Sequence, residues 1–118
     1  MIKVIHSKDK ERYPYPERVY IGRGSPLGNP FTHLRAERTK AVFQCGSRFE
    51  AINRYRPYIA EKIASKDPDV CLSMNSIYRK ALEGNVYLVC FCAPESCHGD
   101  VIKQLVEEKI RILCTKEK

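Results

Sequence analysis

The segment 90–100 gathers side chains that could carry out covalent chemistry. Cys97 and His98 are adjacent there, and Asp100 follows two residues later, where an apolar strand pattern has given way to a helical one. The first turn of a helix presents N–H groups without partners and the positive end of the helix dipole, which stabilise a thiolate, as does a nearby histidine. We therefore expect Cys97 to be a nucleophile and His98 an acid or base, with Asp100 orienting a proton or capping the helix.

Two other interpretations of this segment stay open. Cys90, Cys92, Cys97 and His98 are four potential zinc ligands, although Cys-x-Cys and adjacent Cys-His are cramped around one tetrahedral ion. Alternatively the segment is structural, with Cys90 and Cys92 as small core residues and with Cys97 or Asp100 as a helix cap. The sequence does not decide among the three interpretations, and we assign no metal ligand.

A second candidate segment is the glycine-rich run GRGSPLGNP at residues 22–30. It matches neither a dinucleotide-binding GxGxxG motif, because its third glycine comes one position late, nor a phosphate-binding loop that ends in Gly-Lys-Ser/Thr. Backbone N–H groups exposed by glycines, a guanidinium, a hydroxyl and an amide could still bind a phosphate or a carboxylate. The alternative is a rigid structural turn. The candidate ligand-binding residues, with one cysteine from the first segment, are Gly22, Arg23, Gly24, Ser25, Asn29 and Cys92.

Strands and helices alternate along the chain and would position these two segments. Residues 1–5 and 18–21 are predicted to be short strands, and the prolines within 6–17 favour an extended segment between them. Residues 86–92 are β-branched, aromatic and nearly continuous in apolar character, which predicts a central strand covered on both faces.

Three helices are predicted. Ser47 and Glu50 have the spacing of a capping box, so a helix should begin there, and Pro57 should kink or interrupt it. A second helix is expected across about 69–82, stopped by Gly84, and a third from near Cys97 to Lys109. Residues 110–114 are interpreted as a final strand or a frayed extension.

This alternation predicts a small three-layer, Rossmann-like α/β domain with a mostly parallel sheet. At 118 residues the whole chain, 1–118, is expected to be a single domain. Neither a secretory signal nor an apolar run of roughly 20 residues is present, so we expect a cytoplasmic protein without membrane association. In that reducing compartment the 6 cysteines are not expected to form disulfides.

The chain has a formal charge of +7, from 21 Lys and Arg against 14 Asp and Glu, which favours a polyanionic partner. The positive charges are scattered, so a nucleic-acid partner stays an alternative to a solvated basic surface. Tyr13, Tyr15 and Tyr20 could stack nucleobases, although packing on the domain explains them more simply. His6 and His33 are expected to be surface residues and not ligands.

Together the two segments resemble an uncharacterised domain-of-unknown-function family common in phage and bacterial genomes. The resemblance covers residues 18–109 and depends on GRGSPLGNP at 22–30 and on the CxCxPxxCHGD pattern at 90–100. It implies a small Rossmann-like domain of phage or bacterial origin and brings little biochemistry with it.

We expect the two segments to meet at the carboxyl edge of the sheet and to bind a small phosphorylated ligand, a nucleotide or a nucleotide derivative. Hydrolase or transferase activity at Cys97 stays open, and the cofactor is unknown. The alternative is a zinc-stabilised, phage-type binding module without catalysis, which would attach to a host protein or a nucleic acid.

Overall fold

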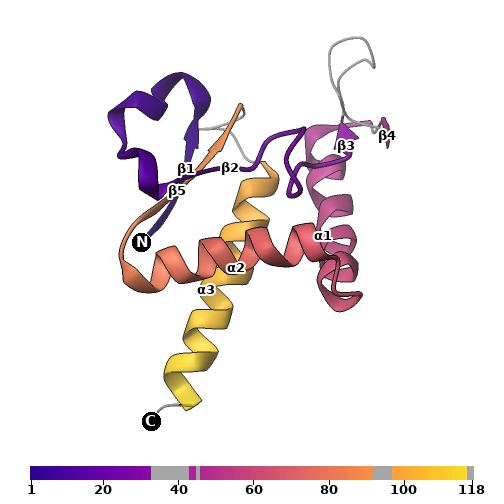
Figure 1. Ribbon diagram of the computed structural model, residues 1–118. Helices are drawn as coiled ribbons and strands as arrows, with labels where there is room; N and C mark the ends of the chain where they lie inside the picture. Colours follow the sequence, from indigo (N-terminus) through magenta and orange to yellow (C-terminus); the bar gives the residue numbers. More distant parts are fainter. Residues whose placement is uncertain (33–42, 45, 92–96, 117–118) are drawn as a thin grey trace.

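The fold is built on a three-stranded parallel sheet, shown in the computed structural model of Figure 1. The structure describes residues 1–32, 43–44, 46–91 and 97–116. Strands β1 (Ile2–His6) and β2 (Arg18–Tyr20) each pair with β5 (Val86–Cys90), which gives the order β1-β5-β2. Because all three strands are parallel, their carboxyl ends lie at one edge of the sheet.

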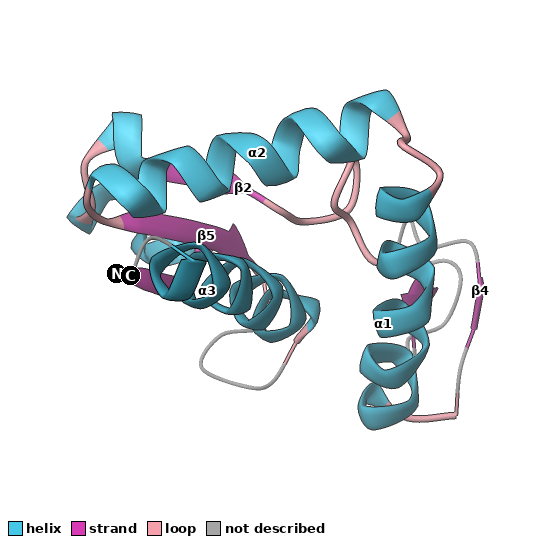
Figure 2. Ribbon diagram, turned by 90° about the horizontal axis from the view of Figure 1, so that it is seen from below, coloured by secondary structure: helices cyan, strands magenta, loops and turns pink. Residues whose placement is uncertain are grey.

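The α-helices of the described residues are α1 (Arg48–Ala64), α2 (Pro68–Glu83) and α3 (His98–Lys116). Two of them, α2 and α3, pack on one face of this sheet, and α1 packs against both of them and against a short strand, β3 (Phe31–Thr32). Figure 2 shows α2 and α3 side by side on this face, with β5 visible between them. The main core forms between the helices and the strands, and its fully buried members include Leu88, Tyr55, Ile77 and Ile102.

The other face is covered by the connection between β1 and β2, which contains two 3-10 helices, Ser7–Arg12 and Tyr15–Glu17. The Tyr13 ring packs on Tyr87 of the central strand with the ring centroids 4.5 Å apart. The predicted three-layer α/β fold with a parallel sheet is thus confirmed. The prolines at 14 and 16 were expected to exclude helix, and this was wrong at Pro16, which lies inside the 3-10 helix Tyr15–Glu17, because a proline is tolerated in the first turn of a helix, where its missing N–H is not needed.

Local signals set the helix boundaries. At the start of α1 the Ser47 hydroxyl accepts a hydrogen bond from the Glu50 N–H at 3.1 Å, as the capping box predicted. The Glu50 carboxylate reaches back to the Gly46 N–H at 2.9 Å. The helix does not end at Pro57, contrary to one of the two outcomes that we expected. Gly84 ends α2, as predicted.

Helix α3 extends through the residues that the sequence left as a strand or a frayed end, to Lys116. A second sheet, also unexpected, pairs β3 (Phe31–Thr32) with β4 (Phe43–Gln44) in parallel. Within the described ranges, no helix is both long and apolar enough to cross a membrane.

Helix α3 approaches the sheet most closely at Gly99, and we predict that Gly99→Ala destabilises the protein. The added methyl group would lie 2.9 Å from Ile21 Cδ1 and 3.1 Å from Val4 Cγ1. Overpacking of this kind costs about 1–3 kcal/mol of folding free energy, which urea unfolding measures. The double variant Gly99→Ala with Ile21→Val removes the nearest atom, so its loss should be smaller than the sum of the two single losses. Unchanged stability of Gly99→Ala would contradict the close packing.

Candidate functional site

The glycine-rich loop that follows β2 is wound tightly on itself. Ser25 donates to the Gly22 carbonyl through its N–H at 3.1 Å and through its hydroxyl at 2.6 Å, and the Gly28 N–H donates to the Ser25 carbonyl at 3.0 Å. Gly24 has a φ of 98°, a conformation that side-chain-bearing residues rarely adopt. A Cβ on Gly28 would lie 2.8 Å from the Gly22 carbonyl oxygen. Two consecutive turns therefore fix the shape of this loop.

Arg23 and Asn29 hold the loop in place. Arg23 donates to the carbonyls of Asn29 and Phe31, both at 3.0 Å. The buried Asn29 amide donates to the Ala51 carbonyl of α1 at 3.1 Å and accepts from the Phe31 N–H at 2.9 Å. Each of the three polar side chains proposed to bind an anion, Arg23, Ser25 and Asn29, thus donates to a backbone carbonyl, as a structural turn requires.

The cysteine-rich segment begins α3, where Cys97 is the capping residue. Its sulfur accepts a hydrogen bond from the Gly99 N–H at 3.3 Å, and the Asp100 carboxylate accepts from the Cys97 N–H at 3.1 Å. The Cys97 side chain is buried, and its sulfur lies 3.6 Å from that of Cys90 at the end of β5. Cys97 and Asp100 therefore stabilise the helix start, whatever chemistry they also perform.

His98 joins the two candidate segments. Its Nε2 lies 2.6 Å from the carbonyl oxygen of Ile21, the residue before the glycine-rich loop. Because a carbonyl can only accept, Nε2 carries the proton. Burial lowers the pKa of His98, and the positive charge of Arg23 lowers it further, against the opposing effects of the Ile21 hydrogen bond and of Asp100. The imidazole is therefore neutral near pH 7, with Nδ1 as an acceptor.

Tyr55 of α1 also belongs to this cluster, although it was not among the site residues predicted from the sequence. Its ring packs against the His98 ring at 5.1 Å, and its hydroxyl donates to the Leu27 carbonyl at 2.7 Å. Burial raises the pKa of Tyr55, with smaller effects from Tyr58 and Cys97, so the phenol stays protonated. No local motif marks such a residue, because its partners lie far away in the sequence.

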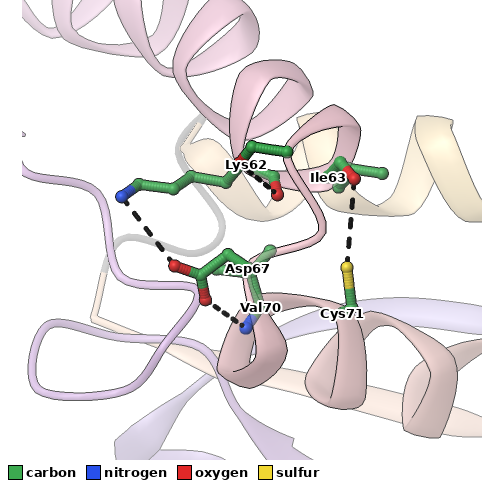
Figure 3. A network of polar contacts seen from close by, with 6 residues as sticks. Lys62, Ile63, Asp67, Val70 and Cys71 are labelled. Atoms are coloured by element: carbon green, nitrogen blue, oxygen red, sulfur yellow. Dashed lines mark hydrogen bonds and ion pairs between the residues drawn. The ribbon is translucent and has the colours of Figure 1, made fainter.

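A groove of about 410 Å³ lies between loop residues 24–26 and the junction of α1 with α2. Figure 3 shows Lys62 reaching toward Asp67, with 3.9 Å between Nζ and Oδ2, while the other carboxylate oxygen caps α2 by accepting from the Val70 N–H at 3.1 Å. Asp69 also lines the groove, so two carboxylates offset the charge of the one lysine. Cys97 and His98 are not among its lining residues.

The zinc interpretation depends partly on Cys92, which lies outside the described residues, as does His33. Within the part of the chain that the structure describes, no three or more His, Cys, Asp or Glu side chains are grouped to hold a metal ion.

The fold and the site define a small α/β domain in which a glycine-rich loop and the first turn of a helix meet at the carboxyl edge of a parallel sheet. The model of a family described as a domain of unknown function, DUF4326, matches residues 4–108. The chain belongs to this family, and the predicted membership of an uncharacterised domain-of-unknown-function family is thereby confirmed. No curated protein and no solved structure matches the chain.

We predict that the buried His98 makes the protein less stable at acidic pH. An unfolded histidine has a pKa near 6.5 and burial lowers it in the folded state, so below about pH 6.5 the unfolded chain binds the additional proton. The stability that neutral His98 contributes is complete above that pH and is lost below it, by at most about 1.4 kcal/mol per pH unit.

Urea unfolding at several pH values between about 7.5 and about 5.5 measures this effect, since this pH range includes the ordinary pKa of histidine. His98→Gln keeps an N–H donor for the Ile21 carbonyl but does not titrate, so its stability should decline less steeply. His6→Gln is the control, because it leaves the His98 hydrogen bond intact. Parallel pH profiles for His98→Gln and the wild type would contradict the assignment.

Proposed function

We propose that this protein binds a small phosphorylated ligand, a nucleotide or a nucleotide derivative, at the carboxyl edge of its parallel sheet. One observation carries the proposal: the 2.6 Å contact between His98 Nε2 and the Ile21 carbonyl brings the glycine-rich loop against the first turn of α3. In open α/β sheets, ligands bind in this position, next to the carboxyl ends of the strands.

The loop would bind the anion mainly through its backbone. Among the hydrogen bonds of the described residues, none uses the N–H of Gly24, which lies at the exposed tip of the loop. Arg23 adds a positive charge close to His98. The Ser25 and Asn29 side chains keep the loop in the conformation that presents this charge and this N–H. Their proposed role is therefore to position the loop.

Any bond-making step is assigned to Cys97, with His98 as acid or base and Asp100 as support. The Gly99 N–H points at the Cys97 sulfur, a contact that stabilises a thiolate at the start of a helix. Neutral His98 offers Nδ1 as a proton acceptor, since Nε2 donates to Ile21. These groups suit a hydrolase or a transferase that acts on the bound ligand.

Calorimetric titration with nucleoside mono- and diphosphates tests the proposal. Arg23→Gln should weaken binding about tenfold or more, because it removes a charge and two loop hydrogen bonds. Arg111→Gln is the control: it removes the same charge from an exposed side chain near the other end of α3. Cys97→Ser should abolish turnover and spare binding. The proposal fails if the wild type binds none of these ligands, or if both site variants behave like the wild type.

A zinc-stabilised, phage-type binding module without catalysis is the second candidate. The observation that favours it is the 3.6 Å separation of the Cys90 and Cys97 sulfurs. Two thiolates on one tetrahedral zinc, with Zn–S bonds of about 2.3 Å, lie roughly 3.7 Å apart. Such a module would contact a host protein or a nucleic acid through the basic surface.

If the protein binds a phosphorylated ligand, as first proposed, its fold does not depend on zinc, and we expect it to stay folded when a chelator is added. Metal analysis of the purified protein, followed by circular dichroism with the chelator, measures this. One zinc per chain together with unfolding on chelation would support the module instead. Binding to nucleic acid that weakens steeply as salt is added would support contact through the basic surface of the module.

A cytoplasmic location and a phage or bacterial source complete the proposal. The source is implied by the two motifs alone.

A further inference from the structure

Three aromatic rings lie together at the carboxyl ends of the three parallel strands. His6 ends β1, Tyr20 ends β2, and Phe91 follows the last residue of β5. The Phe91 ring centroid is 6.0 Å from that of His6 and 6.1 Å from that of Tyr20, with interplanar angles of 88° and 80°. These three side chains form what we call the edge platform.

The central ring of the edge platform faces solvent. Phe91 is 62% exposed and Tyr20 is 44% exposed. An exposed phenylalanine at the edge where α/β sheets bind their ligands is a contact surface, because burying its ring against a partner is favourable.

Neighbouring bonds hold the two flanking rings in fixed orientations. The Tyr20 hydroxyl donates to the Arg23 carbonyl at 3.0 Å, and a Cβ on Gly22 would clash with the Tyr20 ring. His6 accepts the Lys8 N–H at its Nδ1, at 3.0 Å. Because the two flanking side chains are already ordered, binding to the platform costs little conformational entropy.

The edge platform adjoins the loop proposed to hold the phosphate. Tyr20 belongs to the platform, yet it contacts both Gly22 and Arg23 of the loop. An aromatic surface beside an anion-binding loop is suited to a molecule that has a flat ring at one end and a phosphate at the other.

We propose that the edge platform stacks the base of a free mononucleotide, with Phe91 as the stacking surface. This inference rests on the proposed function and deepens it by naming the part of the ligand that gives selectivity. Phe91 is more exposed than Tyr20, and the two flanking rings stand nearly perpendicular to it, so the platform offers one main stacking position, which matches one base and not a strand. Stacking depends little on base identity, so the platform distinguishes nucleotides from sugar phosphates and not one base from another.

Calorimetric titrations with adenosine 5′-monophosphate and with ribose 5-phosphate test the inference, because both probes carry a ribose and a 5-phosphate but only the nucleotide carries a base. The wild type should bind the nucleotide at least fivefold more tightly than the sugar phosphate. Phe91→Ala should abolish this preference and leave ribose 5-phosphate binding unchanged, while Phe91→Trp should keep it. Phe49→Ala is the matched control, since Phe49 is 74% exposed at the start of α1, away from the sheet edge.

The outcomes separate this inference from the proposed function. If neither probe binds the wild type, the proposed function fails and the platform fails with it. If both probes bind equally, or if Phe91→Ala binds the nucleotide as well as the wild type does, only the platform is overturned. A single-stranded oligonucleotide that binds more tightly than the mononucleotide, with a steep dependence on salt, would also overturn the assignment to a free mononucleotide.

Discussion

The buried hydrogen bond between His98 and the Ile21 carbonyl is the constraint on which the arrangement of the site depends. Inside the protein an imidazole N–H needs an acceptor, and a carbonyl oxygen at the end of β2 provides one at 2.6 Å. This bond sets the position of the α3 start relative to the glycine-rich loop. The Tyr55 ring then packs against the imidazole and connects α1 to the same point. Three parts of the chain that are distant in sequence are thereby held at one edge of the sheet.

The polar groups of the glycine-rich loop satisfy one another, which makes the loop rigid before any ligand arrives. The side chains of Arg23, Ser25 and Asn29 donate hydrogen bonds to backbone carbonyls. Gly28 lies so close to the Gly22 carbonyl that no larger residue fits there. Such a loop presents the same N–H groups at all times. For the proposed anion site, a loop that is already ordered means that binding would cost little entropy.

Features that depend on neighbours in the sequence could be predicted, and features that depend on distant partners could not. The cap at Ser47, the stop at Gly84 and the buried strand of Val86–Cys90 follow from residues within a few positions of one another. The meeting of the two motifs followed from the rule that parallel strands share a carboxyl edge. The contacts that Tyr55 makes with Leu27 and His98, and that Phe91 makes with His6 and Tyr20, join residues that lie far apart in the sequence. Cys97 was weighed both as a nucleophile and as a cap, and only the coordinates reveal its capping bonds.

The strand order β1-β5-β2 has a consequence for synthesis on the ribosome. Among the described residues, the partner of both β1 and β2 is β5 (residues 86–90), so neither strand can join this sheet while that segment is still inside the exit tunnel. Strands β1 and β2 emerge before β5 and must wait, with their edges unpaired, until residues 86–90 have left the tunnel. Unpaired strand edges on a nascent chain attract other chains, so this is the interval in which a chaperone would be most useful.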